Sequence, residues 1–359
     1  VTSCQLHHWC CYTSRWRLRA DHLGGLLTTT MLNAKTIDVH AHIVLPESMH
    51  QAGIFGPEIG LSEDNKPWFR IGDYYLHGVK YENSAFMDMD LRLAGMDAAG
   101  IDCQVLSPNP LTYFYFIAAT DAINFCEQHN NALAARINAY PERFRGLAAL
   151  PMQDIAAACN ELDRSVTELG LIGAYIGTDI GRHLDSPDLD PFYEKLVTLD
   201  VPLFIHPAPA GIDGPKGDQN LNQYDLDILT GFAAQETLAI STLIYGGVLE
   251  RHPKLDICFS HAGGAIPMLM GRLNEAGLRR PWASETLCKD GAFETYVSKL
   301  WFDNHVNDPR VLDFVTNMLG TNHLVLGTNF AGWDQHKVDS NAKWMKLLAD
   351  NARRLLRIN

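Results

Sequence analysis

In the stretch TIDVHAH, residues 36–42, a short apolar run ends in two histidines that are separated by one residue. Such a run is typical of a buried β-strand, and side chains alternate along a strand, so His40 and His42 project to the same side. Two imidazoles on one side can share one divalent ion. On their own, two histidines separated by one residue are a weak sign of a metal site. Other strand ends must therefore supply the remaining groups.

Seven more short apolar runs follow, separated by stretches of helical periodicity. The eight runs cover residues 36–39, 102–106, 145–150, 171–176, 202–205, 255–259, 299–302 and 323–326. Helices are predicted near residues 88–98, 118–138, 154–169, 190–199, 227–250, 263–276, 309–318 and 337–355. Eight alternating units indicate the α/β class and a closed (β/α)8 TIM barrel rather than an open doubly wound sheet.

The chain divides into a leader and one predicted domain. Residues 1–30 lack barrel-like patterning and the continuous apolar stretch of a secretory signal, so we predict a non-native or disordered leader there. Residues 31–359 form the predicted barrel domain. Within it, the irregular stretch from Val44 to Phe86 is predicted to be a long loop after the first strand, at the catalytic mouth.

Composition restricts the partners. The net charge of −13 at pH 7 argues against a nucleic-acid partner, and no apolar run is long enough to cross a membrane. The eight cysteines show no C-x-x-C pair, which favours reduced thiols in the cytoplasm. A small organic substrate is therefore expected.

Polar residues follow other predicted strands at the end where barrel active sites are built. His206 ends the fifth strand, His261 follows the sixth, and Asn329 follows the eighth. Imidazole ligands suit zinc and its neighbours. We therefore predict one Zn²⁺, or another divalent metal, per chain.

These stretches resemble the amidohydrolase superfamily, in particular its aminocarboxymuconate semialdehyde decarboxylase branch. The resemblance rests on residues 38–42, 205–207 and 260–264 with residues 271–273, and it runs from about Thr36 to Asn329. It implies a metal at His40, His42 and His206, completed by an aspartate whose position falls on Asn329. It further implies that His261 is the general acid/base. Arg272 would bind a substrate carboxylate in the neighbouring subunit, which implies a homodimer or a higher homo-oligomer.

The sequence departs from that family in three places. Asn329 offers an oxygen but no charge, which counts against an aspartate-dependent hydrolase. Ala208 stands where the decarboxylase has tryptophan, and the first loop offers Lys80 where an arginine for the substrate carboxylate is expected. We therefore predict a metal-dependent nonoxidative decarboxylase, a carbon–carbon lyase, acting on a carboxylated product of aromatic ring breakdown. The alternatives are a zinc-dependent hydrolase or hydratase of a ring-cleavage product, and a catalytically silent binding protein.

A few other residues are candidates for the pocket. Asp303 and His305 follow the seventh strand and could face it. Asp334 could replace the missing carboxylate, but five residues past Asn329 it is expected on the loop surface. Phe330 and Trp333 could line an aromatic pocket or pack the loop. The remaining histidines, including His129 and His252, are expected on the surface or in loops.

Overall fold

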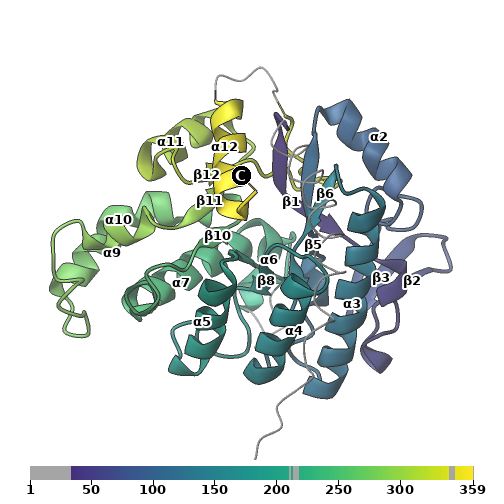
Figure 1. Ribbon diagram of the computed structural model, residues 1–359, viewed down its shortest axis with the longest axis horizontal. Helices are drawn as coiled ribbons and strands as arrows, with labels where there is room; N and C mark the ends of the chain where they lie inside the picture. The colour runs from purple at the N-terminus through teal and green to yellow at the C-terminus, as the bar shows by residue number, and fades with distance from the viewer. Residues whose placement is uncertain (1–33, 210–211, 213–217, 339–343, 359) are drawn as a thin grey trace, which may run out of the picture.

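The computed structural model describes residues 34–209, 212, 218–338 and 344–358, and helices surround a central ring of strands in it (Figure 1). The leader predicted at residues 1–30 lies outside the described residues. The ring consists of β1 (Ile37–Ile43), β5 (Cys103–Pro108), β6 (Phe144–Gly146), β7 (Ala148–Ala149), β8 (Ala174–Gly177), β9 (Leu203–His206), β10 (Ile257–Phe259), β11 (Trp301–Asp303) and β12 (Leu324–Val325).

The strands close into a barrel. All neighbouring pairs in the orders β1-β5-β6 and β7-β8-β9-β10-β11-β12 are parallel. Only Leu147 separates β6 from β7, so the two make one barrel position. On the other side, Asp38 of β1 forms a parallel bridge with Leu326, and the Val39 backbone N–H donates to the Leu326 carbonyl at 2.8 Å. The predicted (β/α)8 TIM barrel is confirmed.

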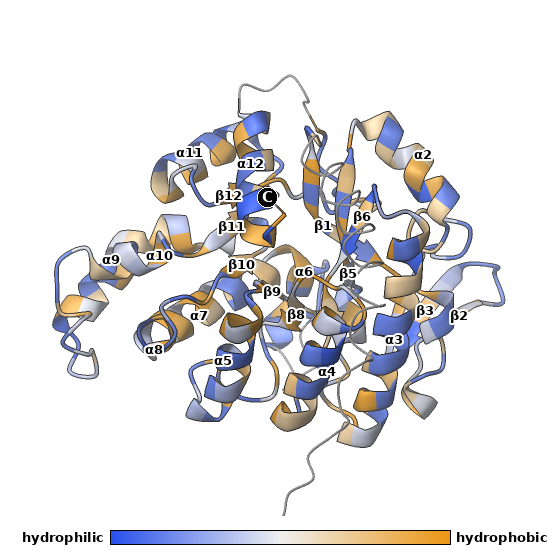
Figure 2. Cartoon of the chain, viewed as in Figure 1, coloured by the Kyte–Doolittle hydropathy of each residue, from blue (hydrophilic) through white to orange (hydrophobic). Residues whose placement is uncertain are grey.

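Helices connect the strands and cover the barrel, with their apolar stripes turned inward (Figure 2). They are α2 (Met89–Ala99), α3 (Ala119–Ala139), α4 (Ile155–Thr167), α5 (Asp190–Leu199), α6 (Leu226–Leu229), α7 (Gly231–Tyr245), α8 (Val248–Arg251), α9 (Ile266–Arg279), α10 (Ala292–Val297), α11 (Pro309–Leu319) and α12 (Met345–Leu356). Short 3₁₀ helices span Pro46–Ser48, Gly53–Phe55, Pro110–Thr112, Pro187–Leu189, Gln219–Leu221 and His261–Gly263.

Local signals set both ends of α2. Asp88 caps α2 by accepting from the backbone N–H groups of Asp90 and Leu91, and Gly100 ends it at φ 70°. The single helix predicted over residues 227–250 is instead three helices. The break after α7 falls at Gly246 and Gly247, where Gly247 has φ 73° and leaves the helical region.

The stretch between β1 and α2 contains a small sheet that the sequence did not predict. Its antiparallel strands are β2 (Glu58–Leu61), β3 (Pro67–Ile71) and β4 (Tyr74–His77). Gly72 and Asp73 join β3 to β4, and Gly72 adopts φ 54° as a tight hairpin turn demands. Tyr74 and Leu76 of this sheet line a pocket that also contains His42, His206 and His261, so the predicted location of the stretch at the mouth is confirmed.

A buried polar network holds β1 in place. The Asp38 carboxylate accepts from Gln104 Nε2 at 3.0 Å and from Thr328 Oγ1 at 2.7 Å, which joins β1 to β5 and to the segment after β12. Arg92 of α2, also fully buried, donates to Gln104 Oε1 at 2.9 Å and to the His42 carbonyl at 2.5 Å. These bonds fix the backbone that carries the two histidines of β1.

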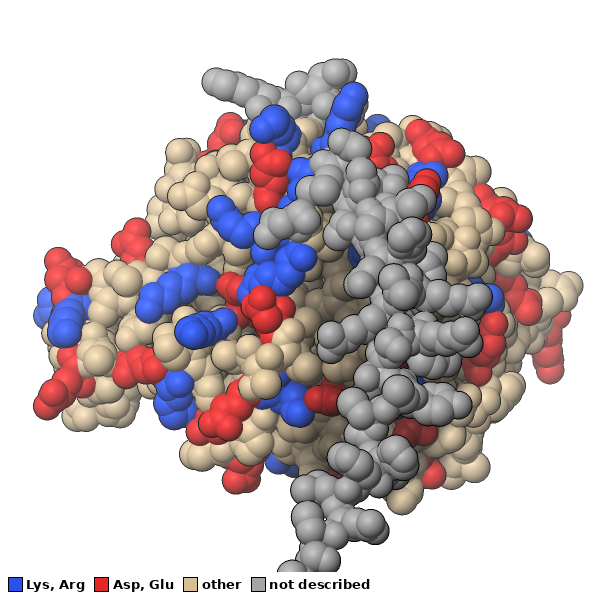
Figure 3. Space-filling view, in the orientation of Figure 1, with Lys and Arg blue, Asp and Glu red and all other residues tan. Residues whose placement is uncertain are grey.

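The surface has mixed charge on the face drawn in Figure 3, where Lys and Arg side chains lie among Asp and Glu. Near the end of α12, Arg357 pairs with Asp200 and Asp256, and Arg353 pairs with Asp350. Within the described residues, no helix has both the length and the apolar character that crossing a membrane requires.

Candidate metal centre

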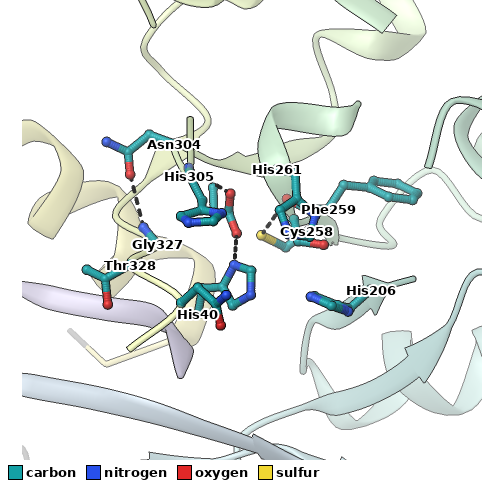
Figure 4. A network of polar contacts seen from close by, with 12 residues as sticks. His40, His206, Cys258, Phe259, His261, Asn304, His305, Gly327 and Thr328 are labelled. Carbon is teal, nitrogen blue, oxygen red and sulfur yellow. Dashed lines mark hydrogen bonds and ion pairs between the residues drawn. The ribbon is translucent and has the colours of Figure 1, made fainter. Parts of the chain in front are cut away.

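Four histidines converge where three barrel strands end. His40 and His42 lie on β1, His206 ends β9, and His261 is the second residue after β10. The His40 ring centroid lies 5.0 Å from those of both His42 and His206 and 5.2 Å from that of His261. Figure 4 shows His40, His206 and His261 around this site. The structure therefore brings together the four histidines that the strand ends predicted.

The first three histidines share one pattern: each Nδ1 has a partner. His40 Nδ1 contacts Asp303 Oδ2 at 2.7 Å, His42 Nδ1 contacts Ser107 Oγ at 2.9 Å, and His206 Nδ1 donates to the Pro207 carbonyl at 2.6 Å. With Nδ1 engaged, Nε2 remains as the lone-pair donor. The Nε2 atoms of His40 and His42 lie only 3.2 Å apart. Outer partners of this kind fix the tautomer of metal-binding imidazoles.

The donor set fits a divalent metal. Burial, followed by the charges of neighbouring histidines, holds the pKa of both His42 and His206 well below the usual value, so both imidazoles are neutral. Ligand atoms of His40, His206 and His261 all lie within 4.8 Å of one another. Imidazoles this close are the ligands that zinc and its neighbours prefer.

His261 Nδ1 also has a carboxylate partner, as His40 Nδ1 has in Asp303. Its Nδ1 donates to Glu236 Oε1 at 3.0 Å, and the same oxygen accepts from Ser260 Oγ at 2.6 Å. Burial lowers the pKa of His261, but the charge and hydrogen bond of Glu236 outweigh it and raise the pKa to about 9. A protonated imidazole cannot ligate a cation, so His42 is the better third ligand and His261 the better proton carrier.

Sequence reasoning missed Glu236. It lies on α7, is fully buried, and helps to order the loops after three strands together with its neighbours. Gln235 donates to the Ala208 carbonyl at 2.8 Å and accepts from Thr178 Oγ1 at 2.7 Å, while Thr237 Oγ1 accepts from the Ala265 backbone N–H. A signal existed in the sequence: Glu236 is the one charged residue between Gly231 and Tyr245.

Two further groups complete the surroundings of His40. Asp303, at the end of β11, has its pKa held at about 2: burial would raise it, but the charge and hydrogen bond of His40 prevail. The His305 ring lies 5.2 Å from His40 and 5.3 Å from His261, so Asp303 and His305 both reach the site.

Asn329 Nδ2 donates to Asp334 Oδ1 at 2.6 Å, and both residues line the pocket. The expectation that Asp334 lies on the loop surface was therefore wrong.

The histidines open into a pocket of about 600 Å³ with aromatic walls. Its lining includes Tyr74, Tyr81, Phe86, Phe232 and Trp333. Among the described lining residues, Lys80 is the only Lys or Arg. Arg272 lies exposed on α9 and is not among them, whereas Phe330 is buried and packs against Arg92. His129, expected on the surface or in a loop, is buried on α3, and His252 is buried in the loop directly after α8.

Comparisons with known proteins agree with this architecture. Residues 37–358 match the family model described as amidohydrolase. The 2-amino-3-carboxymuconate-6-semialdehyde decarboxylase of Dictyostelium discoideum is 35% identical over 244 residues, which cover 68% of this chain and 66% of that protein. The gamma-resorcylate decarboxylase of Rhizobium sp. (strain MTP-10005) is 25% identical and covers 90% of this chain and 98% of its own.

A solved structure of a decarboxylase is also similar to this chain. The 5-carboxyvanillate decarboxylase of Novosphingobium aromaticivorans, complexed with manganese and 4-hydroxy-3-methoxy-5-nitrobenzoic acid, superposes with a TM-score of 0.67 at 25% identity. The superposition covers 76% of this chain and 81% of that one.

Proposed function

The chain belongs to the amidohydrolase family, and from that premise we propose that it is a metal-dependent decarboxylase that removes CO₂ from an aromatic or conjugated carboxylate without oxidation. The observation that carries the proposal is the pairing of two kinds of histidine at one pocket. His40, His42 and His206 present Nε2 as lone-pair donors, whereas the buried Glu236 raises the pKa of His261 to about 9 and keeps its imidazole protonated. Such a site combines a cation with a proton carrier.

We propose that His40, His42, His206 and Asn329 hold one zinc or other divalent ion per chain. When bound, the ion supplies positive charge that polarises a substrate oxygen. The manganese in the carboxyvanillate decarboxylase supports a divalent ion as the metal. The free thiols of Cys103, Cys126, Cys159, Cys258 and Cys288 support a reducing compartment such as the cytoplasm.

The residues of the chain then divide the work. Lys80 attracts the carboxylate of the substrate, and the aromatic walls hold its conjugated body and exclude water. When the bond to the carboxyl carbon breaks, CO₂ leaves and the electron pair stays on the carbon that carried it. His261 delivers its Nε2 proton to that carbon, and Glu236 stabilises the imidazolium beforehand.

A substrate class follows from the pocket. One cation among the described lining residues suits a substrate with one carboxylate near Lys80, while the aromatic lining suits a planar body. A product of aromatic ring breakdown or an intact aromatic acid meets both conditions. The relatives named for gamma-resorcylate and carboxyvanillate support an aromatic acid.

The test measures metal and products together. Protein purified without chelator should hold about one divalent ion per chain, and His206→Ala should lose both the ion and turnover, since it removes one of the imidazole ligands. His77→Ala, on the exposed face of β4, is the matched control and should retain both. Gamma-resorcylate and 5-carboxyvanillate are the probes, with CO₂ release as the readout.

Other outcomes identify the alternatives. A product heavier by one water indicates a hydratase, and two organic fragments indicate a hydrolase. If wild-type protein holds no metal and chelators leave turnover unchanged, the proposal is wrong. Metal binding without turnover of any conjugated acid would favour a binding protein.

A further inference from the structure

The segment after β12 pairs an amide with a carboxylate at the pocket. Asn329 stands where the family resemblance implies an aspartate, and its Nδ2 donates to Asp334 Oδ1 at 2.6 Å. An amide has one acceptor oxygen and one donor nitrogen. With Nδ2 engaged by Asp334, Oδ1 is the atom that Asn329 can offer to a cation.

The turn between the two residues is built for this pairing. Asn329 adopts φ 47°, and its carbonyl accepts from the Gly332 backbone N–H at 2.8 Å. A Cβ on Gly332 would lie 2.6 Å from Asn329 Nδ2 and 2.8 Å from its Cγ. Only glycine leaves room for the amide there. The Ala331 backbone N–H donates to Gln335 Oε1 at 2.9 Å, which closes the turn around Asp334.

His305 fixes Asp334 from the barrel side. His305 Nε2 lies 3.2 Å from the Asp334 carbonyl and 3.7 Å from its Oδ2. The His305 side chain is 3% exposed and contacts the rings of His40 and His261 (Figure 4). The Asp334 side chain is only 16% exposed. A carboxylate this shielded, between the turn and the histidines, interacts strongly with its neighbours.

We propose that Asn329 and Asp334 act as one unit, in which Asn329 Oδ1 binds the metal and Asp334 supplies the negative charge through Nδ2. A carboxylate that accepts from the amide N–H draws the amide toward its charge-separated form and makes Oδ1 more negative. Carboxylates behind metal-binding histidines work in the same way. This inference rests on the proposed metal-dependent function and explains how the site operates with asparagine at position 329.

The decisive experiment moves the charge from one residue to the other. Asp334→Asn keeps the shape of the side chain but removes its charge, and it should weaken Mn²⁺ and Zn²⁺ binding by about 10- to 100-fold, the usual cost of losing an outer partner. The double substitution Asn329→Asp with Asp334→Asn restores one carboxylate and reverses the hydrogen bond. It should bind at least as tightly as the wild type. Affinity is measured by chelator competition, and folding by melting temperature.

Controls separate this inference from the proposed function. Asp227→Asn removes one charge from α6, whose Ile228 and Leu229 line the pocket, without changing Asn329 or Asp334, and it should leave metal affinity unchanged. Wild-type protein that binds no metal would overturn the proposed function. If wild type binds metal and Asp334→Asn binds equally well, only the unit is wrong. A folded double variant that binds no better than Asp334→Asn overturns it too.

Discussion

Glu236 is a fully buried carboxylate, and such a charge is stable only when hydrogen bonds and an opposite charge compensate its desolvation. Burial raises the pKa of Glu236, while the charge and hydrogen bond of His261 and the hydrogen bond from Ser260 lower it. Within the described residues, its Oε2 has no hydrogen-bond partner. The positively charged imidazolium of His261 is therefore the group that compensates the buried charge of Glu236.

We expect Glu236→Gln to slow turnover without loss of the bound metal. The neutral amide could still bond Ser260 and His261 but would no longer stabilise positive charge on the imidazole, so kcat should fall by about 10- to 100-fold, less than for loss of the proton carrier itself. KM, metal content and melting temperature should stay near wild type. Steady-state kinetics and metal analysis check this. A residue with a merely structural role would instead lower the melting temperature while kcat stayed unchanged.

The position of each site residue in its element explains why some of them could be predicted from the sequence and others could not. His40, His42, His206 and His261 stand at strand ends, where the apolar run itself marks the position. Glu236 comes from the middle of a helix, and no strand pattern points to it. Asp334 reaches the pocket only through positive φ angles at Asn329 and Ala331 and the missing side chain of Gly332. Backbone conformations of this kind depend on tertiary contacts.

At the scale of elements, α3 shows how an outer helix is fastened to the barrel. Asn130 Nδ2 donates to the Ala149 carbonyl and its Oδ1 accepts from the Ala149 backbone N–H, both at 2.9 Å. Asn130 also donates to Glu161 of α4 at 2.7 Å. The neighbouring His129 is buried in the same layer, and burial lowers its pKa to about 4 despite an opposing effect of Asn130.

His129 should therefore make the fold sensitive to acid. The unfolded chain binds a proton on this residue near pH 6.5, whereas the folded chain binds one only near pH 4, so stability falls as pH drops through that window. The loss at this one site is about 3 kcal/mol below the window. His129→Leu should flatten the stability profile between pH 7 and 4, as measured by urea unfolding.

The control for this prediction is His50→Leu, whose ring is 68% exposed. It should leave the slope of stability against pH as in wild type. Equal slopes for the wild type and His129→Leu would contradict the assignment of the acid sensitivity to His129.

At the scale of the whole molecule, the alternation of apolar runs and helical stretches was sufficient to predict the barrel. Each predicted strand overlaps an observed one, because buried parallel strands are continuous apolar runs. The small sheet of β2, β3 and β4 was missed, since its strands of four or five residues are partly exposed and carry no apolar run. Its core forms with residues distant in sequence, such as Phe69 with Phe114 and Phe125.

One question at this scale is whether the site is complete in a single chain. Lys80 is the only Lys or Arg among the described pocket residues, and Arg272 is exposed on α9, away from the pocket of its own chain. Met268, four residues earlier and so on the same side of the helix, is 81% exposed. Methionine and arginine are both enriched at interfaces between protein chains, so this side of α9 has the composition of an interface.

We therefore expect a homodimer in which α9 of one copy brings Arg272 to the pocket of the other. Met268→Asp places a charge in that interface and should shift the mass in solution from two chains to one, measured by light scattering during size exclusion. Turnover should fall together with the mass.

Arg272→Ala should leave the dimer intact and raise KM for a carboxylate substrate by about 10- to 100-fold, the cost of a charge-assisted contact. Ile54→Asp, at an apolar side chain 83% exposed elsewhere, is the matched control and should change neither mass nor turnover. If the wild type is a monomer with full activity, or if Met268→Asp stays dimeric, α9 is not the interface and Lys80 must bind the substrate carboxylate alone.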